Sequence, residues 1–341
     1  MGLNTPVSAV FVFGDSTSDP GNNNFVSTPF RSNFTPYGRD FANHKATGRF
    51  TNGRLTSDFI AGYAGIKEYV PPYLDPTLSD EELLTGVSFA SAASGYDPFT
   101  PRISKVIPMQ KQLEYFKEYR SRIEQVIGKD KATQLVERAL FLIVAGTNDF
   151  VLNYYAVPFR RVTFTVPQYQ LFVLQIVHQF IQDLWGQGAR KILVAGLPPM
   201  GCLPIVITTN AFTNNIFNHQ RNCVESLSTV ARNYNQLLQL ELNIINIRLA
   251  AADPRTAIFY LDIYAPLAYL VQGPGRLGFE VVSRGCCGTG YVETSFLCNS
   301  KSHVCSDASK YVFWDSIHPT ERAYYLVFMA LRPVIDFIIR K

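Results

Sequence analysis

The feature that most constrains this chain is a run of five apolar residues that stops at a glycine. Residues 9–13 read Ala-Val-Phe-Val-Phe, and Gly14, Asp15 and Ser16 follow at once. An unbroken apolar run that ends in turn-forming residues is typical of a strand buried on both faces in a parallel sheet. Ser16 then lies just past the carboxyl end of that strand, where open α/β sheets bind their ligands. A serine at this place could be a helix cap or a nucleophile.

Four further segments have a similar apolar character, and helical patterns alternate with them. We expect strands at 86–90, 140–145, 191–196 and 256–262, and helices at 55–64, 109–127, 131–139, 167–185, 221–252 and 319–339. This alternation predicts βαβ units and a parallel sheet with helices on both faces. No linker-like stretch and no internal repeat interrupts the pattern. We therefore predict an α/β fold, a three-layer α/β/α sandwich around a mainly five-stranded parallel sheet. It should form one domain over residues 1–341, with its core at about 7–340.

The composition is that of a chain with a well-filled core. Hydrophobic residues make up 47% of the sequence and charged residues 17%, which does not fit a disordered or fibrous chain. The net charge of +4 is small and spread along the chain, so we expect no nucleic-acid partner. No run of 18 apolar residues occurs, so we expect no transmembrane segment. We also expect a monomer.

The cysteines indicate an oxidising compartment. Six are present, four of them within 20 residues near the C-terminal end: Cys202, Cys223, Cys286, Cys287, Cys298 and Cys305. A zinc site is the alternative, but the spacing matches no CxxC pair and only His303 lies nearby. We favour disulfides and no metal, with Cys202 bonded to Cys223 and the other four paired among themselves.

Two further features bear on secretion. The sequon at Asn33, in a polar loop, makes that residue a candidate for glycosylation. The first residues lack the basic flank and apolar core of a signal peptide. We expect a secreted, extracellular protein whose signal peptide has been removed.

Three of the expected strands end in polar or glycine turns, at residues 14–16, 91–95 and 146–149. In a parallel sheet these ends converge on one edge. Ester cleavage by a serine needs a base for the hydroxyl proton and donors for the oxyanion. Of the five histidines, His318 stands out, because it precedes the last helix and follows Asp315 by three residues. A carboxylate so close can fix the imidazole tautomer and stabilise its cationic form.

Residues 13–23, Phe-Gly-Asp-Ser-Thr-Ser-Asp-Pro-Gly-Asn-Asn, resemble the opening block of the GDSL esterase/lipases of the SGNH-hydrolase superfamily. The plant secreted branch is the most similar. Residues 146–149 resemble the asparagine block of that family, and residues 315–319 its terminal block. The resemblance extends from about residue 9 to 332 and includes 47–50 and 286–288. It implies the flavodoxin-like SGNH-hydrolase fold and ester cleavage without a cofactor.

The resemblance also implies roles for individual residues. Ser16 would be the nucleophile, His318 the base and Asp315 the acid that orients it. The oxyanion hole would comprise the Ser16 backbone N–H, the Asn148 side-chain amide and a glycine N–H from the second block of the family, which corresponds to the turn at residues 91–95 of this chain.

The second block departs from the family pattern. Adjacent glycines are usual where this chain has Ala92 and Ala93, which leaves Gly95 as the nearby glycine. We assign Gly95 to the oxyanion hole, with the N–H of Ala92 or Ala93 as the alternative, because any residue except proline supplies this donor.

Three functions are consistent with these residues. The first is hydrolysis of a small-molecule, lipid or acylated-carbohydrate ester through an acyl-serine intermediate. The second is acyl transfer to an alcohol by the same intermediate, and the third is non-catalytic binding of carbohydrate or lipid on a disabled hydrolase scaffold. Arg49 and Arg54 could bind a substrate carboxylate or sugar, but we favour salt bridges that tether the long loop at 17–54.

Overall fold

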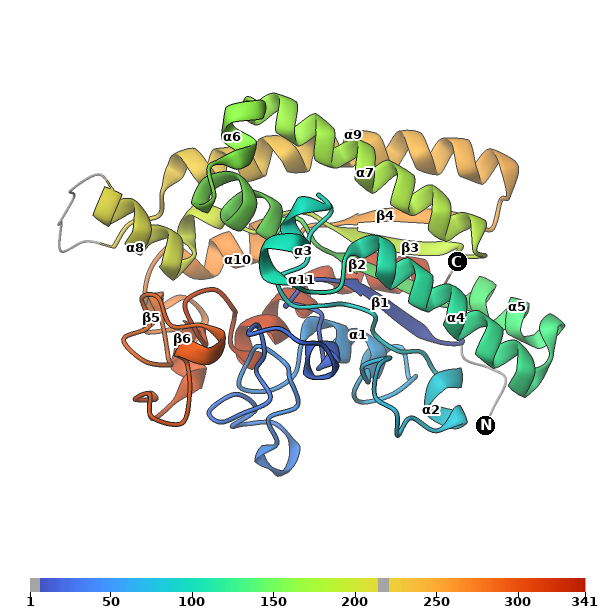
Figure 1. Cartoon of the computed structure of the whole chain (residues 1–341), viewed down its shortest axis with the longest axis horizontal. Helices are drawn as coiled ribbons and strands as arrows, with labels where there is room; N and C mark the ends of the chain where they lie inside the picture. Colours follow the sequence, from blue (N-terminus) through green and yellow to red (C-terminus); the bar gives the residue numbers. More distant parts are fainter. Residues whose placement is uncertain (1–6, 214–220, 341) are drawn as a thin grey trace.

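A four-stranded parallel sheet lies at the centre of the computed structural model, which describes residues 7–213 and 221–340 (Figure 1). The strands lie side by side in sequence order: β1 (Val10–Gly14), β2 (Leu140–Val144), β3 (Lys191–Ala195) and β4 (Ala257–Leu261). The register pairs the first residue of each strand with the first residue of the next. All four strands therefore end at one edge of the sheet.

The expectation of a fifth strand at 86–90 is wrong. This segment does run parallel to β1, because the Val12 N–H donates to Val87 O and the Phe89 N–H donates to Val12 O, at 3.2 and 2.7 Å. Only one bridge, between Val12 and Ser88, is complete.

Two glycines explain why the ladder does not extend. Gly86 has a φ of 93°, which turns the backbone away from extended geometry. The Gly14 N–H, which a longer ladder would use, donates instead to the side chain of Gln112 at 2.8 Å. When the 86–90 segment is counted, the order along the sheet is 86–90, β1, β2, β3 and β4. The chain passes from β1 to the 86–90 segment on one side of β1 and then to β2 on the other side, so the direction of progression reverses between β1 and β2. Ligands of open α/β folds bind at such a reversal.

Helices cover both faces of the sheet (Figure 1). Phe11 and Phe13 point into a core shared with α4, α5, α7 and α9, whereas Val10 and Val12 point into a core shared with α1 and α11. This alternation follows from the two-residue period of a strand. The bounds are α1 (Thr56–Tyr63), α4 (Met109–Ile127), α5 (Lys129–Arg138), α7 (Val166–Gly186), α9 (Glu225–Ala252) and α11 (Glu321–Arg340).

Shorter elements occupy the connections between the central sheet and its long helices. The α-helices are α2 (Asp80–Leu84), α3 (Phe99–Ser104), α6 (Phe159–Thr163), α8 (Pro204–Thr213) and α10 (Tyr264–Val271). A second parallel sheet pairs β5 (Val281–Gly285) with β6 (Tyr311–Phe313). The π-helical turn η3 (Asp149–Ala156) follows β2, and the 3-10 turns are η1 (Asn22–Phe25), η2 (Ala42–His44), η4 (Met200–Cys202), η5 (Arg276–Gly278), η6 (Ser295–Leu297) and η7 (Ala308–Lys310).

The expected disulfide pattern is confirmed. Cys202 bonds to Cys223, and the C-terminal four cysteines form Cys286–Cys305 and Cys287–Cys298. Asn33 is exposed, as a glycosylated asparagine must be. Its glycosylation stays a prediction. Among the described residues, no helix has a stretch long and apolar enough to cross a lipid bilayer.

Candidate functional site

The turn after β1 places Ser16 at the edge where the strands end. Gly14 makes this turn possible, because its φ is 138° and a Cβ there would lie 1.9 Å from the carbonyl oxygen of Val144. Gln112 holds both polar groups of the Gly14 backbone, accepting from its N–H and donating to its carbonyl at 2.8 and 2.9 Å. The turn is therefore fixed by a close approach that only glycine permits and by a buried side chain from α4.

The turn before α11 brings Asp315 and His318 to Ser16. His318 Nε2 lies 2.8 Å from Ser16 Oγ, and His318 Nδ1 lies 2.8 Å from Asp315 Oδ2. Asp315 is fully buried, His318 is 3% exposed and Ser16 is 7% exposed. Three residues expected at one site from distant parts of the sequence thus form one hydrogen-bonded series. The distances suit proton transfer from the hydroxyl to the imidazole.

Asp315 is surrounded by hydrogen-bond donors. Its Oδ1 accepts from the backbone N–H groups of Ile317 and His318 at 2.8 and 2.7 Å. Its Oδ2 accepts from the Tyr37 hydroxyl at 2.7 Å and the Thr294 hydroxyl at 3.0 Å. Burial acts to raise the pKa of Asp315, but the charge of His318 and these backbone donors outweigh it and hold the pKa below its usual value. The carboxyl group is therefore kept ionised.

Tyr37 and Thr294 are site residues that our sequence reasoning missed. Tyr37 lies within the long loop at 17–54, and Thr294 lies in the segment closed by Cys287–Cys298. Neither residue belongs to a motif that indicates a contact with Asp315, so no local signal in the sequence could have found them.

The backbone around Ala93 offers free donors to the site. The Ala92 N–H is occupied, because it donates to Asp19 Oδ2 at 2.9 Å. Within the part of the chain that the structure describes, no hydrogen bond uses the N–H of Ser16, Ala93 or Gly95. Ala93 and Ala92 line the same cleft as Ser16, whereas Gly95 does not line it. Ala93 has a left-handed φ of 64°, an uncommon conformation for alanine.

Asn148 also lines this cleft, at the start of η3. Its side-chain amide donates one hydrogen to Ser94 O at 2.9 Å, which leaves the second hydrogen for a ligand. The neighbouring Asp149 turns away from the cleft and accepts from the N–H groups of Tyr96 and Asp97 at 2.8 and 3.1 Å. The segment around Ala93 and the start of η3, which hold the free N–H donors, are therefore joined by hydrogen bonds.

Gly95 has a structural reason to be glycine. A Cβ at this position would lie 2.3 Å from Asp149 Oδ1. Burial raises the pKa of Asp149 to about 7, and the hydrogen bonds it accepts act against this rise. Gly95 thus makes room for a buried carboxyl group that ties the second block to η3.

A cleft of ≈ 710 Å³ opens at Ser16. Its large apolar lining residues are all buried or half-buried, and we call them the inner part of the cleft: Phe30, Phe50, Val151, Leu152, Ile205, Val206, Leu227 and Ile317. Polar side chains from η3, α6 and α8 are half-buried or exposed, and we call them its outer part: Tyr155, Arg161, Thr209, Asn210 and Thr213. The volume suits a ligand the size of a small organic molecule.

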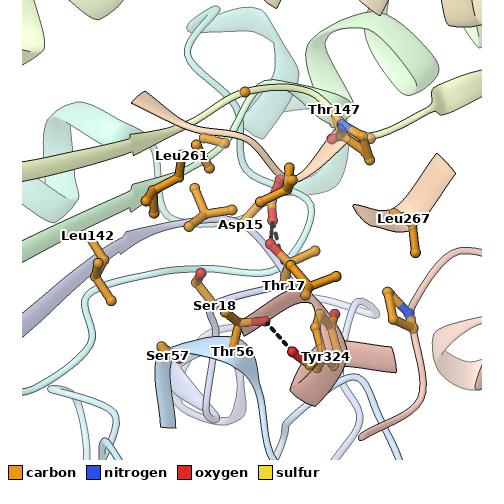
Figure 2. A pocket seen from close by; sticks show the side chains of 18 of the residues that line it. Asp15, Thr17, Ser18, Thr56, Ser57, Leu142, Thr147, Leu261, Leu267 and Tyr324 are labelled. Atoms are coloured by element: carbon orange, nitrogen blue, oxygen red, sulfur yellow. Dashed lines mark hydrogen bonds between the residues drawn. The ribbon is translucent and has the colours of Figure 1, made fainter. Parts of the chain in front are cut away.

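A second, smaller cavity of ≈ 90 Å³ lies behind the nucleophile turn, between the sheet edge and α11 (Figure 2). Its walls are mostly apolar, but Asp15 and Tyr324 face it. Asp15 Oδ1 accepts from the backbone and hydroxyl of Thr17, and burial raises the pKa of Asp15. The buried Tyr324 hydroxyl has no hydrogen-bond partner within the described residues. Ile317 lines both cavities, but Ser16 lines only the larger cleft.

Arg49 and Arg54 lie outside both cavities and form ion pairs. Arg49 makes two hydrogen bonds to the carboxylate of Asp58, at 2.9 and 2.8 Å, and Arg54 bonds to Glu321 at 2.7 Å. These pairs connect the long loop to α1 and α11, as we favoured from the sequence.

A known protein family and several known proteins are similar in sequence to nearly the whole of this chain. The family model described as GDSL-like Lipase/Acylhydrolase matches residues 10–331. The chain is 56% identical to GDSL esterase/lipase At5g45960 of Arabidopsis thaliana, over 98% of this chain and 88% of the relative. It is 46% identical to GDSL esterase/lipase APG of the same plant, over 95% and 90%.

A solved structure, the lipase Lip_vut3 from a goat rumen metagenome, matches at a TM-score of 0.40 and 11% identity over 96% of both chains. The family assignment rests on the sequence comparisons alone. Because the family model and the relatives both match nearly the whole sequence, the chain belongs to the GDSL-like lipase/acylhydrolase family.

Proposed function

We propose that this protein is a serine ester hydrolase that acts through an acyl-enzyme at Ser16. The observation that carries the proposal is the series from Ser16 Oγ to His318 Nε2 and from His318 Nδ1 to Asp315, each step at 2.8 Å. The site also opens into the ≈ 710 Å³ cleft, so a substrate can reach the hydroxyl. The Arabidopsis relatives are named esterase/lipases, which supports the same reaction class.

In the first half-reaction, His318 Nε2 takes the hydroxyl proton as Ser16 Oγ attacks the ester carbonyl carbon. The carbonyl π electrons move to its oxygen, which becomes the oxyanion of a tetrahedral intermediate. The Asp315 carboxylate stabilises the imidazolium that forms. As the C–O bond to the alcohol breaks, His318 returns the proton to the departing oxygen. The acyl group is left on Ser16 Oγ.

The second half-reaction repeats these steps with water. His318 takes a proton from water, and the resulting hydroxide adds to the acyl carbonyl. Collapse of this intermediate breaks the bond to Ser16 Oγ, which regains its proton from His318. The products are a carboxylic acid and the enzyme in its starting state.

The oxyanion hole in this proposal comprises the N–H groups of Ser16 and Ala93 together with the Asn148 amide. Ala93 takes the place of Gly95 because Ala93 lines the cleft and its N–H has no other partner within the described residues. Alanine supplies this donor as well as glycine does. The departure at Ala92 and Ala93 from the adjacent glycines of the family is therefore compatible with catalysis.

We propose an amphiphilic or acylated ester as the substrate and an extracellular location. The apolar inner cleft favours an acyl chain over a fully polar group. All six cysteines form disulfides, which persist in oxidising compartments.

The test is Ser16→Ala, with Ser18→Ala as a matched control. Ser18 is also a buried serine after β1, but it lines the smaller cavity instead of the cleft. Hydrolysis of p-nitrophenyl esters by Ser16→Ala should fall on the order of 10⁴-fold or more. A fluorophosphonate probe should label the wild-type and Ser18→Ala proteins and leave Ser16→Ala unlabelled. Full activity of Ser16→Ala would overturn the mechanism.

Acyl transfer is the second candidate, because an apolar inner cleft can hold an alcohol next to the acyl-enzyme and exclude water. The wild-type enzyme should be given an aryl ester together with a series of alcohols. Transfer would appear as a new ester at the expense of free acid. Free acid as the only product with every acceptor would leave hydrolysis as the reaction.

A further inference from the structure

The outer part of the cleft carries one permanent charge. Among the described residues that line the cleft, Arg161 is the only arginine or lysine, and no aspartate or glutamate lines it. No carboxylate within residues 7–213 and 221–340 forms an ion pair with Arg161, which is exposed. An exposed guanidinium that lines the cleft and has no carboxylate partner among the described residues is available to a ligand.

Arg161 is held at this place by its neighbour. Arg160 does not line the cleft and makes two hydrogen bonds to the buried carboxylate of Asp97, at 2.7 and 2.6 Å. The same guanidinium lies over the rings of Phe99, Phe164 and Phe172 at 5.4–5.8 Å. These contacts anchor α6, a helix too short to be stable alone. Arg161 therefore projects from a fixed element.

A second donor accompanies Arg161 in the same wall. Tyr155 lines the cleft from η3, and within the described residues its hydroxyl makes no hydrogen bond. Burial raises the pKa of Tyr155 to about 12, with the charge of Arg161 acting in the opposite direction. The phenol thus stays protonated at neutral pH and can donate. A phenol and a guanidinium together suit an oxyanion such as a carboxylate or a phosphate.

We propose that Arg161 and Tyr155 form a subsite for an anionic group of the ester substrate. The inference rests on the proposed function, because it places this group at the outer end of the cleft that opens at Ser16. The apolar inner part would receive the chain next to the ester, and the outer donors would bind the charged end. The substrate class is therefore an amphiphilic ester with an anionic terminus, on either its acyl or its alcohol side.

Two matched pairs of substrates distinguish the two sides. The acyl pair is the mono-p-nitrophenyl ester of suberic acid, with a free carboxylate, and its methyl-capped form. The alcohol pair is the octanoyl ester of 3-hydroxypropyl phosphate and that of 1,3-propanediol. We expect the wild-type enzyme to show a higher kcat/KM for the anionic member of at least one pair, by roughly fivefold or more. That preference should shrink as NaCl rises towards 1 M.

Arg161→Gln should abolish this preference by lowering kcat/KM more for the anionic member of a pair than for the neutral one, and Arg161→Lys should retain part of the preference. Arg248→Gln is the matched control, because Arg248 is an exposed arginine on α9 outside the cleft, and it should leave the preference intact. Equal kcat/KM within both pairs, or a preference that persists in Arg161→Gln, would overturn the subsite while hydrolysis stands. Failure of the wild-type enzyme to turn over any of the four esters would count against both this subsite and the proposed function. In that case loss of fluorophosphonate labelling would identify the proposed function as the part that fails.

Discussion

The Tyr37 hydroxyl should be one of the strongest supports of the acid at the site. It donates to Asp315 Oδ2 at 2.7 Å and accepts from the backbone N–H of Ser295 at 2.8 Å. Both partners are buried, and Tyr37 itself is fully buried. Tyr37→Phe keeps the ring and removes only this hydroxyl. The substitution therefore isolates two hydrogen bonds without opening a cavity.

Each lost bond has an expected cost. A hydrogen bond to a charged group stabilises a protein by about 1.5–3 kcal/mol, and a buried donor left without a partner costs about 1–3 kcal/mol. Water or a small shift of the backbone can partly replace the hydrogen bond that the Ser295 N–H loses. We therefore expect the free energy of unfolding to fall by about 3 kcal/mol at neutral pH. Asp315 keeps four donors, from Thr294, Ile317 and the backbone and ring of His318. Catalysis should therefore weaken without being abolished.

The pH dependence gives a second readout. The folded-state pKa of Asp315 lies below its usual value of 3.8, so its ionisation contributes stability that is present above about pH 4 and lost as the pH falls through the folded-state pKa. Tyr37→Phe should raise this pKa. The stability difference between the variant and the wild type should be complete at neutral pH and should shrink below about pH 4.

Urea unfolding at pH 7 and at pH 3, with kcat/KM on an aryl ester, tests this reasoning. Tyr69→Phe is the control, because the exposed Tyr69 hydroxyl bonds only to the adjacent Glu68 within the described residues, and it should change the free energy of unfolding by less than about 0.5 kcal/mol. Two results would refute the argument: an unfolding free energy of Tyr37→Phe equal to that of the wild type, or a loss that is the same at both pH values.

Two further substitutions test the surroundings of the nucleophile. Ala93→Gly should leave kcat/KM unchanged and leave the melting temperature equal or higher, because relief of the left-handed φ of 64°, about 1 kcal/mol, offsets the entropy that glycine loses on folding; a drop in stability above 1 kcal/mol would contradict this. Tyr324→Phe should keep or raise the free energy of unfolding by about 1 kcal/mol, because the buried hydroxyl has no partner within the described residues. A fall in urea unfolding stability would instead show that water in the smaller cavity binds this hydroxyl.

The sheet could be predicted from the sequence because each strand carries its own signal. The four apolar runs of β1–β4 lie in separate segments, and each is long enough and apolar enough to identify a buried strand. The 86–90 segment has a similar composition, but one local and one non-local feature prevent a full strand: the φ of Gly86 and the hydrogen bond from the Gly14 N–H to Gln112. Hydrogen bonds to a side chain 98 residues away leave no mark in local composition.

The side chains that we propose to react are indicated by the sequence for a different reason. Ser16 follows a strand directly, and Asp315 and His318 share one turn, so short motifs indicate all three. The residues around them come from loops and from the short helix α6. Tyr37, Thr294 and Arg161 meet the site only through the tertiary fold, and nothing in the adjacent residues distinguishes them from surface polar residues.

Two separate parts of the fold support the site, one at Ser16 and one at Asp315 and His318. The Ser16 turn is continuous with β1 and is held by Gly14 against β2. The Asp315 turn is held by the disulfide-bonded region: the N–H groups of Cys286 and Cys287 donate to the carbonyls of Phe313 and Trp314 at 3.0 and 2.9 Å.

The same region contacts the turn at two more points. The Ser316 N–H donates to Glu293 O at 2.8 Å, and a Cβ on Gly285 would lie 2.6 Å from the backbone of Asp315. Thr294, a donor to Asp315, lies between the two cysteines of the Cys287–Cys298 loop. The disulfide-bonded region therefore supports the Asp315 turn, which lies outside the central sheet. Their loss would loosen the acid and base relative to a nucleophile that the sheet still holds, so an oxidising compartment suits the geometry of the site as well as the stability of the chain.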